Sequence, residues 1–134
     1  MVQPSGRLVS VELADAESGI LADLRAWVHD LLTDTATPAP AIAVTLCVLT
    51  ELVTNALTHG APAGQCRLRL VPGEVLRVEI DDRSPRPASV ADHTTRSITT
   101  GGFGLVVVQD MAAAWGQVPR PSGGKTVWAE IDLR

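Results

Sequence analysis

The ten residues ELVTNALTHG, Glu51 to Gly60, carry the strongest structural signal in the chain. They end a long segment, starting near Ala41, whose apolar side chains recur all around a helix, which is typical of a helix buried on most sides. Two polar groups interrupt it. Glu51 and Asn55 are four residues apart and therefore share one helix face, one turn apart. Because an unpartnered buried carboxylate or amide costs about 1–3 kcal/mol, the pair either lines a cleft or finds internal partners. A partly exposed polar face near the helix end is the equally open alternative.

Further strands and helices are predicted on both sides of this helix. Upstream, alternation predicts a strand over residues 7–13, and a 3.6-residue apolar stripe predicts an amphipathic helix over 16–34. Downstream, two alternating runs joined by Pro72-Gly73 predict a hairpin. The remaining segments are a long loop, a short helix and a closing strand: residues 83–101, 104–115 and 125–133.

This order of elements, without strict alternation, predicts an α+β fold. The expected architecture is a two-layer α/β sandwich, with a mixed but mostly antiparallel sheet and the helices on one face. The 134 residues fit one domain, residues 1–134.

Composition excludes several classes of function. The chain has a formal charge of −4, Lys125 is its only lysine, and aromatic residues make up 3%. Nucleic-acid binding is therefore not expected, since it needs a basic face or exposed rings. Two cysteines, Cys47 and Cys66, do not make a disulfide framework, which favours a reducing, cytoplasmic setting. No run of eighteen apolar residues occurs, so neither a membrane span nor membrane association is expected.

The strand that ends at Asp82 adds a second polar group. Val78 and Ile80 alternate toward the core and Asp82 continues their parity, whereas Asp81 is expected to face solvent. A core-facing carboxylate needs a hydrogen-bond donor. The exocyclic amine of an adenine is one candidate, and a backbone amide or an arginine is the more common one.

The third signal is Gly101-Gly102-Phe103-Gly104, directly before a predicted helix. Glycines there let backbone N–H groups approach phosphate oxygens at the positive end of the helix. A plain loop-to-helix junction is the simpler interpretation. The segment is not a dinucleotide fingerprint, because Val107 stands where a glycine is required.

In this order, the three segments resemble the boxes of the histidine-kinase-like (Bergerat-fold) ATPases. ELVTNALTHG resembles their N box, VEIDDRSPRP their adenine-binding aspartate box, and GGFGLVVVQDMAAAWG their second glycine box. GKTVWAEIDL resembles their closing strand. The most similar type is the stand-alone anti-sigma-factor serine kinase, abundant in actinobacteria.

The resemblance implies roles for individual residues and two cofactors, ATP and Mg²⁺. Glu51 stands at the position of the general base, Asn55 at that of the Mg²⁺ ligand, and Asp82 at that of the acceptor for the adenine amine. The other positions implied in nucleotide binding are His59, Gly102, Gly104 and Thr126. A helix-terminal histidine and an ordinary strand threonine are the alternative interpretations of His59 and Thr126.

The resemblance also implies a function in transcription regulation. The expected protein is an ATP-dependent protein serine/threonine kinase that phosphorylates an anti-anti-sigma protein and binds a sigma factor; a homodimer is a further expectation. One departure stands against this. The family pattern Asp-x-Gly-x-Gly is replaced after Asp82, with Ser84 and Arg86 in the glycine positions. The alternative is a nucleotide-gated binding module that sequesters a sigma factor or another regulator without kinase activity.

Overall fold

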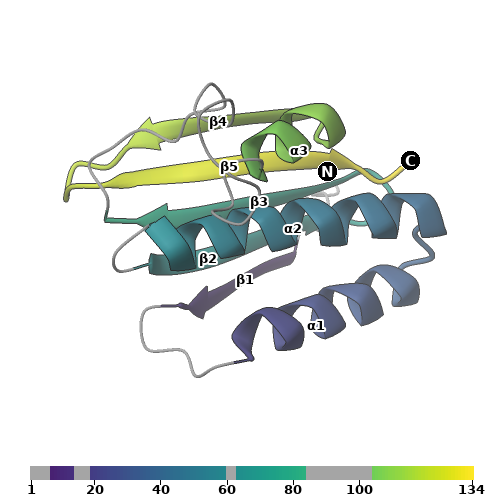
Figure 1. Cartoon of the computed structure of the whole chain (residues 1–134). Coiled ribbons are helices and arrows are strands. Elements are labelled where there is room, and N and C mark those ends of the chain that lie inside the picture. The colour runs from purple at the N-terminus through teal and green to yellow at the C-terminus, as the bar shows by residue number, and fades with distance from the viewer. Residues whose placement is uncertain (1–6, 14–18, 60–62, 84–103) are drawn as a thin grey trace, which may run out of the picture.

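The computed structural model describes residues 7–13, 19–59, 63–83 and 104–134 (Figure 1). It is the predicted α+β sandwich: a five-stranded antiparallel sheet in the order β1-β2-β3-β5-β4, with α1, α2 and α3 on one face. In chain order the elements are β1 (Arg7–Glu12), α1 (Ile20–Asp34), α2 (Ala39–His59), β2 (Ala63–Val71), β3 (Val75–Asp82), α3 (Gly104–Met111), β4 (Ala114–Pro119) and β5 (Lys125–Asp132).

The core lies between α2 and the inner face of the sheet. Strand alternation sends every second side chain of β3 and β5 toward the helices, as the buried residues Val78, Ile80, Val127, Ala129 and Ile131 illustrate. From α2, the side chains of Val48, Leu49, Leu52 and Val53 are buried against them. Burial of this apolar surface is the main favourable contribution to folding, and it fixes α2 across the middle of the sheet (Figure 1).

The same apolar character has a second consequence for α2. By length and composition alone, Ala39–Thr58 would be long enough and apolar enough to cross a membrane, although the sequence predicted no span. In the structure this helix packs on the sheet and supplies the centre of the core. A core helix of a folded domain meets the same length and composition test.

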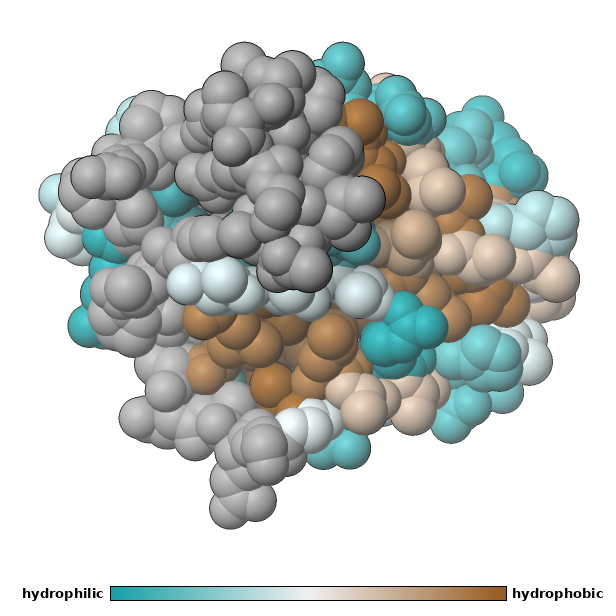
Figure 2. Space-filling view, viewed as in Figure 1, coloured by the Kyte–Doolittle hydropathy of each residue, from teal (hydrophilic) through white to brown (hydrophobic). Residues whose placement is uncertain are grey.

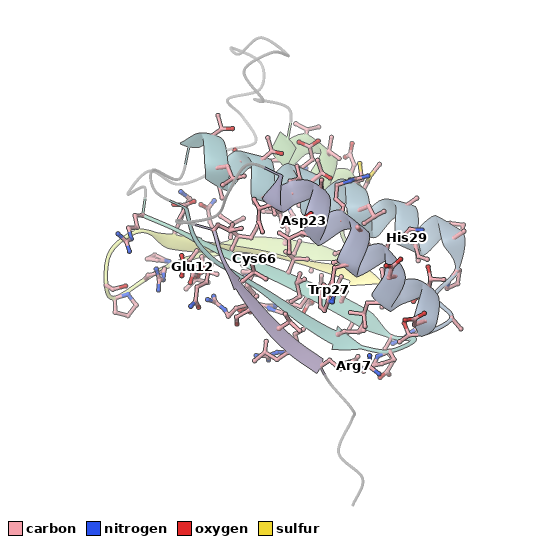
Figure 3. All side chains as sticks on the ribbon, turned by 90° about the horizontal axis from the view of Figure 1, so that it is seen from below. Arg7, Glu12, Asp23, Trp27, His29 and Cys66 are labelled. Carbon is pink, nitrogen blue, oxygen red and sulfur yellow. The ribbon has the colours of Figure 1, made fainter. Side chains whose placement is uncertain are left out.

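An apolar groove of about 290 Å³ runs along the other edge of the helical layer, between β1 and α1. Figure 2 shows apolar side chains on this face of the molecule, in the area between α2 and α1. Asp23 and Trp27 lie on the side of α1 that faces β1 (Figure 3). The groove is lined by Val9, Val11, Ile20, Asp23, Leu24 and Trp27.

The segment after α3 corrects the sequence prediction. One short helix was predicted over 104–115, but α3 ends at Met111 and β4 pairs with β5 from Ala114 onward. The alanines before Trp115 have high helix propensity, which made the helix look longer. Packing decides otherwise: the Trp128 ring covers Gly116 so closely that a Cβ at Gly116 would lie 2.9 Å from it.

Candidate functional site

A narrow recess opens between α2 and the point where β3 ends and β5 begins. Its polar lining residues are Asn55 and Asp82, two of the residues predicted for the site. The apolar lining residues are Leu52, Ala56, Ile80 and Val127. The recess is shallow, and in this conformation its walls lie too close together to enclose a water molecule. An apolar wall with a few convergent polar groups is the usual composition of a small-molecule site.

The predicted polar pair lies on α2, which forms one side of the recess. Glu51 and Asn55 lie one turn apart on the continuous helix and are both half-buried. Within the residues that the structure describes, neither side chain has an internal hydrogen-bond or ion-pair partner. Asn55 lines the recess, whereas Glu51 does not. The half-buried state of both side chains is also compatible with the partly exposed polar face that the sequence left open.

The sheet side of the recess holds a buried ion pair that the sequence did not predict. Lys125 Nζ donates to Asp82 Oδ1 at 2.9 Å, and the two residues are cross-strand partners in β5 and β3. Only 3% of Asp82 and 9% of Lys125 are exposed. Asp82 does face the helices, as its parity predicted. Its donor among the described residues is a lysine, whereas the sequence suggested an arginine or a backbone amide.

Gly124 allows β5 to begin this close to Asp82. A Cβ at Gly124 would lie 2.1 Å from the Asp82 carbonyl oxygen and 2.7 Å from the Cα of Arg83. Its φ of +78° is also in the left-handed region that favours glycine. A side chain at this position would push the start of β5, and Lys125 with it, away from the recess.

Asp81 and Thr126 lie on the opposite face of the sheet. The prediction that Asp81 faces solvent is wrong: it is 3% exposed, because Arg67 binds both of its carboxylate oxygens. Thr126 Oγ1 donates to Asp81 Oδ1 at 2.7 Å, so its hydroxyl points away from the recess. Burial raises the pKa of Asp81, but the hydrogen bonds from Arg67 and Thr126 outweigh it and leave that pKa below its ordinary value.

The other predicted site residues lie near the ends of the helices. His59 is the last residue of α2 and Gly104 the first of α3, and these two helices pack against each other. Gly102, Ser84 and Arg86 fall outside the described residues.

The donor set fits one kind of metal binding. In the described ranges, no three His, Cys, Asp or Glu side chains gather to hold a metal ion. Mg²⁺ does not need such a cage, since it commonly keeps several waters and takes one or two protein oxygens together with substrate phosphates. The half-buried Asn55 amide at the mouth of the recess is an oxygen donor of that kind.

Comparison with known proteins assigns most of the chain to a family. A family model described as "histidine kinase-like ATPase domain" matches residues 14–131, a span that includes all described elements except β1 and the last residue of β5. No curated protein matched the chain.

Proposed function

Since the chain belongs to the histidine kinase-like ATPase domain family, we propose that it is an ATP-binding regulatory protein of the anti-sigma-factor serine kinase type. In this proposal it transfers the γ-phosphate of ATP to a serine of an anti-anti-sigma protein, and it also binds a sigma factor. Family membership supports ATP binding. The observation that carries the proposal is the recess in which Asn55 of α2 and Asp82 of β3 come together between apolar walls.

The side chains that line the recess match the chemistry of a purine base, although the walls of the recess would have to move apart for a base to enter. Leu52, Ile80 and Val127 offer apolar surface to the base, and the Asp82 carboxylate is an acceptor at the buried end. The exocyclic amine of adenine is a matching donor. A buried carboxylate that gains this hydrogen bond also favours adenine over bases without a donor at that edge.

The α2 pair would act on the phosphate side. Asn55 would hold Mg²⁺ through its amide oxygen, and bound Mg²⁺ would offset the charge that develops on the phosphate oxygens. Gly102 and Gly104 would give backbone N–H groups to the triphosphate, with His59 at the helix end beside it. Thr126 has no part in this arrangement, because its hydroxyl is bound to Asp81 on the other face.

Glu51 would serve as the general base. The serine Oγ of the partner attacks the γ-phosphorus, the bond from that phosphorus to the β,γ-bridging oxygen breaks, and ADP leaves. The serine proton passes to the Glu51 carboxylate, directly or through one water. A half-buried carboxylate that has no partner among the described residues is suited to this role.

Two measurements test the proposal. Mg-ATP at about a hundredfold excess over its Kd should stabilise the protein by about 2.7 kcal/mol, and Asn55→Ala or Asp82→Ala should remove most of this gain. Incubation with γ-labelled ATP and a candidate anti-anti-sigma protein should label a serine on that protein. Glu51→Ala should abolish labelling while ATP still stabilises the variant. Absence of any thermal shift with adenine nucleotides would refute nucleotide binding.

A second candidate function rests on the residues after Asp82. Ser84 and Arg86 stand where the family pattern has glycines, and a residue with a side chain has less backbone freedom than glycine. This favours a binding module whose contact with a sigma factor depends on the bound nucleotide, without phosphoryl transfer. ATP binding that changes affinity for a sigma factor, together with no labelling of any partner, would favour the module over the kinase.

A further inference from the structure

The ion pair between Lys125 and Asp82 offers a hydrogen-bond donor and an acceptor side by side, in addition to balancing charge. It places a cationic donor, Lys125 Nζ, 2.9 Å from Oδ1 of Asp82, and Asp82 is a polar lining residue of the recess. A buried lysine is uncommon, and burial of two charges is costly unless their geometry serves some purpose. This chain uses its only lysine here.

We propose that Lys125 is a specificity-determining residue that reads the purine edge together with Asp82. Asp82 accepts a hydrogen bond from the exocyclic amine of adenine, and Lys125 Nζ donates one to the adjacent ring nitrogen N1. The inference rests on the proposed function, because it requires the base to lie in this recess.

The hydrogen-bonding capacity of the two groups supports this pairing. An ammonium group has three N–H donors, and Asp82 Oδ1 takes one of them. The Watson–Crick edge of adenine presents a donor, the amine, directly beside an acceptor, N1. An acceptor and a donor held side by side on two paired strands are complementary to that edge.

The surroundings hold the lysine in a position to act. The ammonium is already ordered by Asp82 and by burial, so little side-chain freedom remains to be lost when a base binds. Gly124 brings the start of β5 against the Asp82 backbone, which fixes the distance between the two strands at this point. The hydroxyl of the next residue, Thr126, is on the other side of the sheet and cannot substitute for the lysine.

A purely structural role for Lys125 makes a different prediction. If the lysine only neutralised a buried carboxylate, its removal would destabilise the fold and weaken the binding of every nucleotide by the same factor. If it donates to N1, its contribution depends on one atom of the ligand. The two roles are separated by exchanging that atom.

The experiment is calorimetric titration of the full chain with Mg-ATP, with 1-deaza-ATP, in which N1 is replaced by C–H, and with purine riboside triphosphate, which lacks the amine. Wild type should bind 1-deaza-ATP about tenfold more weakly than ATP, the size of one charge-assisted hydrogen bond. In Lys125→Met this tenfold preference should disappear. Purine riboside triphosphate should still bind more weakly than ATP to both the wild type and Lys125→Met.

Arg120→Met is the matched control. It removes a cation that lies 3.6 Å from Asp81 on the opposite face, and it should leave the preference for N1 intact. Equal affinity of wild type for ATP and 1-deaza-ATP would overturn the inference while leaving the proposed function standing. No binding of any adenine nucleotide would overturn both. The comparison of ATP with 1-deaza-ATP needs only the wild type, so equal affinities overturn the inference even where Lys125→Met fails to fold.

Discussion

Arg67 of β2 binds Asp81 of β3 through two parallel hydrogen bonds, Nη1 to Oδ2 at 2.6 Å and Nη2 to Oδ1 at 2.8 Å. The pair lies on the face of the sheet opposite the recess, directly behind Asp82. Arg67 Nε also donates to Glu79 at 3.0 Å, so one guanidinium ties together two carboxylates of β3. The two consecutive aspartates of β3 therefore face opposite sides, and each is held by a cation from a neighbouring strand.

Replacing Arg67 by Met should lower the free energy of unfolding by about 3 kcal/mol, because it leaves Asp81 buried without its main partner. Urea denaturation followed by circular dichroism measures the change. The exposed pair Arg134–Asp132, 4.0 Å apart, is the control, and Arg134→Met should leave the unfolding midpoint unchanged. Equal effects of the two substitutions would contradict the importance of burial.

The stability of the protein should fall at acidic pH through Asp81. Its pKa is lower in the folded chain than in the unfolded chain, so the unfolded chain takes up the proton first as the pH drops. The stabilisation is complete above the ordinary carboxyl pKa of about 4 and is lost as the pH falls through the folded value. The difference in unfolding free energy between wild type and Asp81→Asn should shrink from about pH 5 to about pH 2. A difference that stayed constant over this range would show that Asp81 does not titrate in this way.

Gly124→Ala should disrupt the site far more than Gly123→Ala. Both glycines have positive φ, so both substitutions introduce backbone strain of about 1 kcal/mol. Only the Cβ at Gly124 would overlap the Asp82 backbone, whereas nothing lies within 4 Å of a Cβ at Gly123. Thermal melts with and without Mg-ATP measure the contrast: Gly123→Ala should keep the shift caused by ATP, and Gly124→Ala should lose it.

Thr126→Val should have little effect on nucleotide affinity. The substitution removes the hydrogen bond to Asp81 and should cost about 1 kcal/mol of stability. Calorimetry with Mg-ATP should give the wild-type Kd, since the hydroxyl lies on the other face of the sheet. A large loss of affinity would instead restore Thr126 to the base-binding role that the sequence suggested.

Cys66 should resist alkylation in the folded protein. Burial raises the pKa of its thiol to about 12, so almost no thiolate forms near neutral pH. Cys47 is half-buried and should react first with iodoacetamide at about pH 8. Cys47 and Cys66 lie on one tryptic peptide, but cleavage after Glu51 separates them. Mass spectrometry of peptides cut after glutamate, before and after urea unfolding, distinguishes the two sites.

Local patterns predicted the parts of the fold that depend on one segment. The apolar run of α2 and the alternation of β3 are visible in sequence, and they were enough to direct Asp82 toward the helices. The burial of Asp81, by contrast, depends on Arg67, which lies in another strand. Likewise, the position of Lys125 beside Asp82 depends on how β5 pairs with β3. The pairing of strands that are distant in sequence is fixed by three-dimensional packing. It produces no periodic pattern within one segment, so it could not be predicted from the sequence.

The same limit explains β4. Ala114 and Trp115 continue a helix-forming stretch, and only the contact of Gly116 with the Trp128 ring shows why the chain extends there instead. The register of β5 directs the Thr126 hydroxyl to the face of Asp81, because one residue along a strand changes the face. The base-binding role expected of Thr126 stays a prediction, which Thr126→Val tests.

The strand order has a consequence for biosynthesis. β5 is inserted between β3 and β4, although it is made after both of them. A nascent chain that ends before Lys125 lacks the strand that joins β3 to β4. In such a chain β1, β2 and β3 can pair, whereas one edge of β3 and the whole of β4 still await β5. An incomplete product would therefore present unpaired strand edges, which favour aggregation.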